Sequence, residues 1–310
     1  MGRSEQQHPM LPVLDFRTED LKPGSDSWFE RCRSVRQAFE EHGCFIAVYD
    51  KVCEEIQNGV FCSMKELFDL SLETKRRNTY EGAPLKGYVG QHPKIPLHQS
   101  MGIDQGTTLE GIQSFVHKMW PKGNDQFCKH IIEYAKVAEE LDGMVARMIF
   151  ESYGLSEYYE SYIGSTSYLL RLLKHTAPGE VEPQVGLVAH TDKSFTTILH
   201  QNHVNALMVE TRNGVWIDVD FSSPNSFVVM AGDALMAWSN DRIQSPNHKV
   251  LMMNGKETRY SLGLFAFYKG ILKVPEELID EEHPVQYKPF DHLGLLNFTY
   301  SANMKAYCGV

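Results

Sequence analysis

The part of the chain that most constrains the fold runs from residue 163 to residue 267, where short β-type runs alternate with turn residues. Short strands at regular spacing are typical of a sandwich or a barrel. The stretch 212–214 and the pair 254–255 carry the Asn-Gly dipeptide and predict hairpin turns. We therefore expect a mainly β fold with flanking helices: a double-sheet jelly roll, or double-stranded β-helix, that encloses a cavity. Its expected strands are 167–173, 196–200, 206–210, 215–219, 226–230, 234–238, 249–253 and 260–267.

Helical patterns precede this block. Apolar residues recur at helical spacing in 25–41, 53–70 and 125–153, and glycines follow the first and the last of these segments. Two short apolar runs, 11–16 and 44–49, predict strands. Residues 81–111 are rich in Gly and Pro and predict a long loop, which is uncommon unless the loop is functional.

These patterns predict three parts in one compact unit. Residues 1–160 form a helical and strand-containing part that packs on the core, and residues 161–270 form the jelly roll. Residues 271–310 form a C-terminal segment, in which 295–300 predicts a helix that could act as a lid.

The composition excludes several classes of protein. Thirty Lys and Arg against forty Asp and Glu give a net charge of −10, which argues against a nucleic-acid partner. Six scattered cysteines without a CxxC pair predict free thiols in a reducing compartment. The polar first residues and the lack of an 18-residue apolar run predict no leader and no membrane span. We expect a cytoplasmic protein, and nothing in the sequence demands more than a monomer.

Three residues within the β block can hold a metal ion. His190 and Asp192 are two apart, and His248 lies 58 residues further on (248 − 190 = 58) after a Pro-containing turn. If His190 and Asp192 lie on a strand or at its end, the alternation of side chains sends both the same way. Two imidazoles and one carboxylate can occupy one face of a six-coordinate metal, as in the non-haem Fe(II) oxygenases.

A second pair of polar residues follows at a short distance. Arg259 and Ser261 come 11 and 13 residues after His248 (259 − 248 = 11, 261 − 248 = 13) and share one face if they lie on a strand. A guanidinium and a hydroxyl on one face can hold one carboxylate through several hydrogen bonds. Together, the metal ligands and this clamp predict an oxygenase that binds a 2-oxo acid.

At this point the chain resembles a known family, the plant Fe(II)/2-oxoglutarate-dependent dioxygenases. The resemblance covers nearly the whole chain. Within the family, the chain is most similar to the branch that includes the glucosinolate side-chain enzymes, which is near the dioxygenases that oxidise auxin. The motifs that carry it are His190-Thr-Asp192, His248, Arg259-Tyr-Ser261 and the stretches 12–15, 41–45, 72–75, 87–88, 120–124, 231–234 and 307–310.

The resemblance implies an enzyme that uses Fe(II), 2-oxoglutarate and O₂, with ascorbate as a supporting reductant. His190, Asp192 and His248 would hold iron, and Arg259 and Ser261 would hold the distal carboxylate of 2-oxoglutarate. No side chain beyond the metal centre would act as the oxidant. The expected reaction hydroxylates, desaturates or dealkylates a small plant specialised metabolite or hormone, while 2-oxoglutarate is decarboxylated to succinate.

The chain departs from the family pattern before the His-x-Asp motif. Many relatives have an "N-Y-Y-P" run whose Asn and Tyr help to bind the co-substrate, and this chain has 174–178 (Lys-His-Thr-Ala-Pro) there. Lys174, His175 or Thr176 could substitute, and Lys174 and Thr176 are our co-substrate candidates. Asn205 stands where relatives have a glycine, and Asn tolerates a left-handed turn better than most residues.

Aromatic side chains near these motifs are the candidates for substrate contact. Such rings would offer a stacking surface to a ring-containing substrate, which we expect to be aromatic or carboxylate-bearing. The candidates are Tyr80, Tyr88, Phe115, Phe195, Phe265 and Phe267. Each of these rings taken alone is as typical of a core.

Two other functions fit parts of the same pattern. Some relatives keep the Arg-x-Ser pair but use no 2-oxo acid, so a 2-oxoglutarate-independent oxidase of the same fold is one alternative. A catalytically silent barrel that binds a small molecule is the other, although a pure binder has no need for three metal ligands.

Overall fold

The computed structural model describes residues 10–17, 21–83, 86–179, 183–221, 223–253, 255–296 and 304–310. Within these residues, eight strands form the larger sheet in the order β1-β2-β10-β7-β12-β5-β4-β3. All neighbours in this sheet are antiparallel except β1 and β2, which are parallel. The strands are β1 (Val13–Asp15), β2 (Cys44–Val48), β3 (Val89–Gly90), β4 (His98–Asp104), β5 (Thr166–His175), β7 (Thr196–Gln201), β10 (Ser226–Ala231) and β12 (Arg259–Tyr268).

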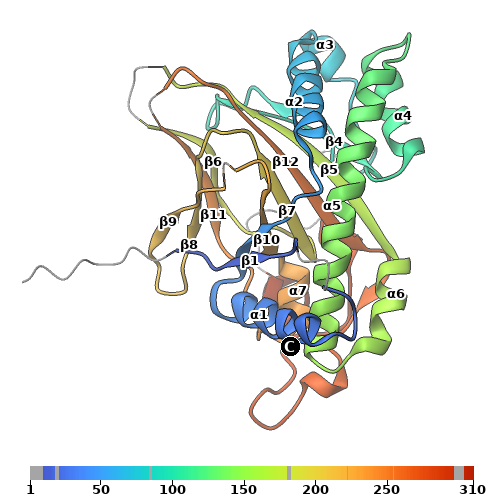
Figure 1. The fold of residues 1–310 in the computed structure, drawn as a ribbon, viewed down its shortest axis with the longest axis vertical. Coiled ribbons are helices and arrows are strands. Elements are labelled where there is room, and N and C mark those ends of the chain that lie inside the picture. The colour runs from blue at the N-terminus through green and yellow to red at the C-terminus, as the bar shows by residue number, and fades with distance from the viewer. Residues whose placement is uncertain are drawn as a thin grey trace, which may run out of the picture.

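The smaller sheet has the order β6-β11-β8-β9 and lies against one face of the larger one (Figure 1). Val209 of β8 belongs to the same apolar cluster as Val228 and Met230 of β10, which joins the two sheets as in a jelly roll. The strands are β6 (Gln184–His190), β8 (Leu207–Glu210), β9 (Trp216–Asp218) and β11 (His248–Met252), and a separate pair is formed by β13 (Ile271–Leu272) and β14 (Phe290–Asp291).

Helices cover the other face of the larger sheet. The long helix α5 (Asp125–Ser152) runs beside this sheet and contacts α1, α2 and α4 as well as β7 and β12 (Figure 1). The helices are α1 (Asp26–His42), α2 (Glu54–Asp69), α3 (Leu72–Lys75), α4 (Leu109–Met119), α6 (Tyr159–Gly164), α7 (Asp233–Trp238), α8 (His292–Leu295) and α9 (Met304–Cys308), with 3-10 turns at Ser156–Tyr158 and Glu276–Leu278.

Helix α1 shows how local chemistry sets these boundaries. The Ser25 hydroxyl accepts from the backbone N–H of Trp28 at the first turn, and Gly43 ends the helix in the left-handed conformation with φ 71°. A Cβ at Gly43 would lie 2.4 Å from the carbonyl oxygen of Gln244. Glycine is therefore required for the backbone and for the close packing of α1 on the loop before β11.

The expected fold class is confirmed, with three differences in detail. Residues 234–238 were predicted to be a strand, but they form α7, which a short apolar run cannot distinguish from a strand. The predicted loop 81–111 contains β3, β4 and the start of α4, and β6 was not among the expected strands. The hairpin residue Asn254 and residues 297–300 of the expected lid helix lie outside the described residues.

The expected three parts of the chain share one core. Strands β1 to β4 come from the part before residue 160 and pair within the larger sheet, which also contains β5 and β12. The main apolar cluster includes Phe45, Leu264 and Met304, one from each part.

Among the described residues, none of the helices is both long and apolar enough to cross a bilayer.

A buried carboxyl group joins α5 to the larger sheet. Asp142 is 1% exposed, and it accepts hydrogen bonds from the hydroxyls of Thr196 and Tyr168. Burial raises the pKa of Asp142 to about 6. Because the folded-state pKa lies above the unfolded value, folding is favoured by protonation, and this contribution is lost as the pH rises through about 6.

We predict that Asp142→Asn gains stability relative to the unmodified protein as the pH rises from about 4.5 to about 7.5, because the amide does not ionise. The gain over this range should be on the order of 2 kcal/mol, because each step of one pH unit between about 4.5 and the folded-state pKa of about 6 changes the relative stability by about 1.4 kcal/mol. Urea unfolding of both proteins across this pH range measures it. Parallel stability curves would contradict a protonated Asp142 in the folded state.

Candidate metal centre and carboxylate clamp

Three metal-ligand side chains converge at one end of the smaller sheet, where β6 ends and β11 begins. His190 ends β6 and His248 begins β11, and the two residues are paired in the antiparallel register, so their rings lie 4.2 Å apart between centroids. Asp192 follows two residues after His190, and its Oδ1 lies 3.7 Å from Nε2 of His190 and 3.8 Å from Nε2 of His248. The donor atoms of all three lie within 4.8 Å of one another, which suits a common cation.

The backbone fixes which nitrogen of each imidazole is available. Nδ1 of His190 lies 2.9 Å from the carbonyl oxygen of Val188, and Nδ1 of His248 lies 3.2 Å from that of Pro246. A carbonyl can only accept, so both Nδ1 atoms carry the proton and both Nε2 lone pairs face Asp192. Burial lowers the pKa of His248 to about 4, which keeps this ring neutral and able to coordinate.

The carboxylate of Asp192 is oriented from behind. Its Oδ2 accepts a hydrogen bond of 2.8 Å from the Thr197 hydroxyl, and Thr197 in turn contacts Ser194 at 2.7 Å between the two hydroxyl oxygens. Oδ1 is therefore left to face the two histidines. Among the three ligands, His190 is the most exposed, with 18% of its side chain accessible against 8% for Asp192.

The loop that carries Asp192 is tied to two later segments. The backbone N–H of Asp233, at the start of α7, donates to the carbonyl of Asp192 at 2.7 Å. His292 of α8 is fully buried, and its Nδ1 accepts from the backbone N–H of Tyr268 while its Nε2 donates to the carbonyl of Lys193. Asp233 thus holds the loop of Asp192 through its backbone N–H.

The clamp residues lie on the inner face of the larger sheet, which faces the smaller sheet. Arg259 is 2% exposed, and its Nε donates to Gln201 at 2.9 Å while Nη1 donates to the Ser261 hydroxyl at 2.9 Å. No carboxylate among the described residues forms an ion pair with Arg259. Burial lowers the pKa of its guanidinium to about 10, still far above neutrality, so the site holds a buried positive charge that an anion would neutralise.

Gln201 is the part of this clamp that the sequence motifs did not indicate. It is fully buried, and its amide nitrogen donates to Asn205, which itself donates to Asp220 at 2.7 Å. Asn205 does not adopt the left-handed conformation expected for it, because its φ is not positive. Its side chain instead holds the amide that orients Arg259.

Strand alternation decides which other residues share the face of Arg259. In the pairing of β5 with β12, His175 is opposite Arg259 and Lys174 is opposite Tyr260. Lys174 therefore lies on the outer face, where its Nζ is 5.9 Å from the centroid of the Tyr260 ring. Thr176 follows the end of β5 and is exposed. Our sequence-based choice of Lys174 for co-substrate binding is wrong in this geometry, and Thr176 is not brought into the buried clamp.

Two of the six aromatic candidates lie on the face of the larger sheet that is turned toward the smaller sheet. Phe265 and Phe267 alternate with Arg259 and Ser261 along β12, so they share the inner face. Phe265 is opposite Thr197, which holds Asp192, and Phe267 packs on His292 with 5.3 Å between ring centroids.

The other four aromatic candidates do not lie on the inner positions of β12, and we correct the predictions for Phe195, Phe115 and Tyr88, while Tyr80 stays a prediction. Phe195 is fully buried against Tyr162 and Trp238, and Phe115 is stacked on Phe127 in the helical layer. The Tyr80 hydroxyl caps the edge of β4 through the backbone of Gly102 and Asp104. The Tyr88 hydroxyl bonds to Gln99, whose register position lies on the outer face with Lys174.

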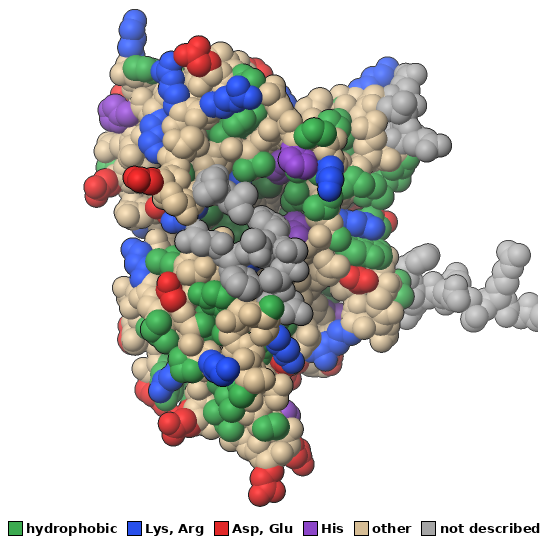
Figure 2. All heavy atoms as spheres, turned by 180° about the vertical axis from the view of Figure 1, so that it is seen from behind, with side chains coloured by type: hydrophobic (Ala, Val, Ile, Leu, Met, Phe, Trp, Pro, Cys, Tyr) green, Lys and Arg blue, Asp and Glu red, His purple; other side chains and the backbone are tan. Residues whose placement is uncertain are grey.

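Polar residues of β4 and β5 line the inner face beside the clamp, and of these only His175 was among the sequence-based candidates. They are His98, Ser100, Arg171 and His175, all on the strand positions that share a face with Arg259. Figure 2 shows the molecule from behind with a hollow near its middle, which has histidine and basic side chains along it and no large area of one charge around it.

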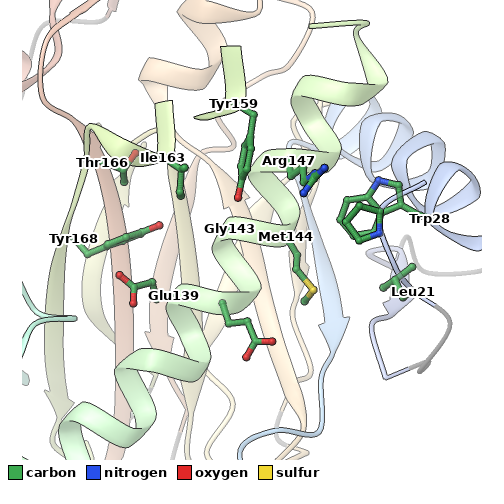
Figure 3. A pocket seen from close by; sticks show the side chains of 12 residues that line it. Leu21, Trp28, Glu139, Gly143, Met144, Arg147, Tyr159, Ile163, Thr166 and Tyr168 are labelled. Atoms are coloured by element: carbon green, nitrogen blue, oxygen red, sulfur yellow. The ribbon is translucent and has the colours of Figure 1, made fainter. Parts of the chain in front are cut away.

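A separate cavity of about 440 Å³ lies on the other side of the larger sheet (Figure 3). Tyr168 lines it from β5, and Met144 and Arg147 line it from α5. Tyr168 occupies the strand face opposite to Arg171, so the sheet separates this cavity from the metal ligands. It is therefore not the space in which a substrate would meet the metal.

Comparison with known proteins agrees with this arrangement. Residues 166–267 match the 2OG-Fe(II) oxygenase superfamily, and residues 11–109 match the N-terminal region described as non-haem dioxygenase in morphine synthesis. A probable 2-oxoglutarate-dependent dioxygenase of Arabidopsis thaliana, AOP1.2, is 43% identical over 296 residues, which cover 93% of this chain and 90% of that protein.

Solved structures share the fold over most of the chain. The dioxygenase for auxin oxidation of rice has a TM-score of 0.80 at 25% identity and covers 97% of this chain and 100% of its own. The 2-oxoglutarate complex of the corresponding Arabidopsis thaliana enzyme has a TM-score of 0.77 at 25% identity, over 89% of this chain and 100% of its own.

The fold and the site together define an Fe(II)-dependent oxygenase. The chain belongs to the 2OG-Fe(II) oxygenase superfamily. It is a 2-oxoglutarate-dependent dioxygenase of the plant type, with Fe(II) and 2-oxoglutarate as its cofactor and co-substrate.

We predict that Thr197→Val weakens divalent-metal binding about tenfold or more, because Oδ2 of Asp192 loses the hydroxyl that orients the carboxylate. Titration of the full chain with Mn(II), followed by electron paramagnetic resonance, measures the affinity. The matched control is Thr196→Val, whose hydroxyl contacts Asp142 and not Asp192. Equal metal affinity in both variants would show that Thr197 does not orient the ligand.

Proposed function

We propose that this dioxygenase oxidises a small, carboxylate-bearing plant metabolite or hormone, with His190, Asp192 and His248 as the iron ligands. Arg259 and Ser261 hold the distal carboxylate of 2-oxoglutarate. The observation that carries the proposal is a buried cation, without an acidic partner among the described residues, on the sheet face that is turned toward the three convergent metal donors. A carboxylate at Arg259 would neutralise this charge, so the donor set and the clamp fit the cofactors of the family.

The chain contributes orientation more than reactive groups. Fe(II), with 2-oxoglutarate and O₂, supplies the oxidising chemistry when bound, and 2-oxoglutarate is converted to succinate and CO₂. Thr197 and the two backbone carbonyls aim the three ligands at one point. Gln201 holds the guanidinium of Arg259 in place before any ligand binds, so little reorganisation is needed on binding.

Two inner-face residues support a substrate that carries a carboxylate and an apolar or aromatic part. Arg171 of β5 is a second cation on this face. It lies two residues along β5 from Leu173, which is opposite Ser261. Phe265 lies at the next inner position of β12 after Gly263, which pairs with Arg171. An anion at Arg171 and a ring or chain against Phe265 would place the intervening carbon beside the metal ligands.

The wider setting is also a proposal. We assign the protein to the cytosol and to a monomeric state. All six cysteines are free, which suits a reducing compartment. The large exposed apolar residues, such as Met10, Phe29 and Val310, come from distant segments of the sequence.

The metal assignment has a direct test. Replacing His190, Asp192 or His248 with Ala should abolish substrate-dependent succinate release, because two ligands cannot hold the metal firmly. Mass-spectrometric detection of succinate in the full chain measures this. Full activity in any one of the three variants would remove the assignment. Turnover of substrate without added 2-oxoglutarate would favour the oxidase alternative, in which Arg259 holds the substrate's own carboxylate.

The substrate class has a separate test. A panel of plant carboxylic acids should include members that stimulate 2-oxoglutarate decarboxylation, whereas their methyl esters should stimulate it at least about tenfold less because a charge-assisted hydrogen bond is lost. Carbon dioxide release, measured for each acid and its ester at equal concentration, gives the comparison. Esters that are as effective as the acids would contradict a carboxylate-binding role for Arg171.

A further inference from the structure

His175 is a buried polar residue for which the metal centre gives no role. It is fully buried on the inner face of β5, and its Nδ1 has no hydrogen-bond partner within the described part of the chain. A Cβ at Gly186 of the smaller sheet would lie 2.8 Å from Cδ2 of His175, so the imidazole fills the space between the two sheets. A buried and unpaired ring nitrogen is costly unless a ligand completes it.

A chain of hydrogen bonds leads from Arg171 to this histidine. Nη2 of Arg171 donates to Ser100 Oγ at 2.6 Å, Ser100 Oγ lies 3.2 Å from Nε2 of His98, and Nδ1 of His98 lies 3.0 Å from Nε2 of His175. Burial lowers the pKa of His98 to about 3 and places the pKa of His175 well below its ordinary value. Both rings are therefore neutral, with one proton each.

The guanidinium of Arg171 decides which atoms donate in this series of hydrogen bonds. Arg171 can only donate, so Ser100 Oγ accepts there, and Ser100 is buried with His98 as its other described partner. The serine O–H then donates to His98, whose remaining proton is on Nδ1 and is donated to Nε2 of His175. A neutral His175 must carry its own proton on Nδ1, which makes the unpaired atom an N–H donor.

The register shows which way this donor points. Strand β5 lies between β4, which carries His98, and β12, which carries Arg259, and His175 is opposite both residues in the antiparallel pairings. The two nitrogens of an imidazole point away from each other around the ring. Because Nε2 faces β4, Nδ1 faces β12 and the guanidinium of Arg259. Directly opposite residues have Cβ atoms only about 5 Å apart, so His175 and Arg259 are close enough to bind the same carboxylate.

We propose that the Nδ1–H of His175 donates to the distal carboxylate of 2-oxoglutarate beside Arg259 and Ser261, and that Arg171, Ser100 and His98 hold His175 in the tautomer that makes this possible. The inference rests on the proposed function of the clamp. In this proposal, His175 takes the place of the Asn and Tyr that many relatives have in an "N-Y-Y-P" run before the His-x-Asp motif and that this chain lacks. Lys174 cannot do so because it lies on the outer face, and Thr176 is exposed.

Binding of two 2-oxo acids to the Mn(II)-loaded full chain tests the proposal without turnover. 2-Oxoglutarate has the distal carboxylate, and 2-oxopentanoate is a 2-oxo acid of the same chain length without it. His175→Gln places an amide near the Nε2 position and keeps a partner for His98, but it has no donor at the Nδ1 position. We expect calorimetry to show 2-oxoglutarate binding about tenfold or more weaker and 2-oxopentanoate binding within about twofold of the unmodified protein.

Two further variants separate binding from packing. His175→Asn places its amide nitrogen near the original Nδ1 position and should retain 2-oxoglutarate affinity within about threefold. Lys174→Met changes the neighbouring residue on the outer face and should leave the affinity for both acids unchanged. Mn(II) affinity and the unfolding temperature, measured for each variant, show whether the site and the fold are intact.

The outcomes distinguish this inference from the proposed function. If Arg259→Met loses 2-oxoglutarate binding while His175→Gln keeps it, the clamp stands and the role of His175 is overturned. The role is also overturned if His175→Asn loses as much affinity as His175→Gln, or if both acids weaken equally. If Arg259→Met binds 2-oxoglutarate normally, the proposed clamp itself is wrong.

Discussion

The register of β12 between β5 and β7 is the constraint on which the site depends. Arg259 is opposite His175, and Ser261 is opposite Leu173 on one side and Gln201 on the other. Side chains of a strand alternate between the faces of a sheet, so a slip of one residue would send the guanidinium into the helical layer and bring Tyr260 between the two sheets. The same alternation carries Phe265 and Phe267 to the inner face.

The site is organised by groups that hold other groups. Backbone carbonyls fix the tautomers of His190 and His248, Thr197 orients Asp192, and Gln201 orients Arg259. Each contact reduces the reorganisation that would otherwise accompany ligand binding. A guanidinium that is buried away from water, with no acidic partner among the described residues, lowers the free energy of unfolding. Favourable contacts elsewhere in the fold offset this loss.

Much of this structure was predictable from sequence, and the failures have identifiable causes. The helices α1, α2 and α5 follow from apolar periodicity, and the ligand set follows from the spacing of His190, Asp192 and His248. Lys174 was chosen for its charge, but charge does not reveal strand parity. Phe195 was chosen for its nearness to the motif, although its ring points into the core with Trp238.

The sequence by itself determined the chemical inventory: two imidazoles, a carboxylate and a guanidinium at spacings that suit strands and turns. It also determined the mainly β class, because period-two apolar runs can bury a face only against another sheet or a helical layer. Tertiary structure alone decided that His98 and Ser100, more than seventy residues before Arg171 and His175 in the chain, line the same wall. The physical reason is that contacts across neighbouring strands depend on the register, which arises from the packing of both faces at once and leaves no local signal in the sequence.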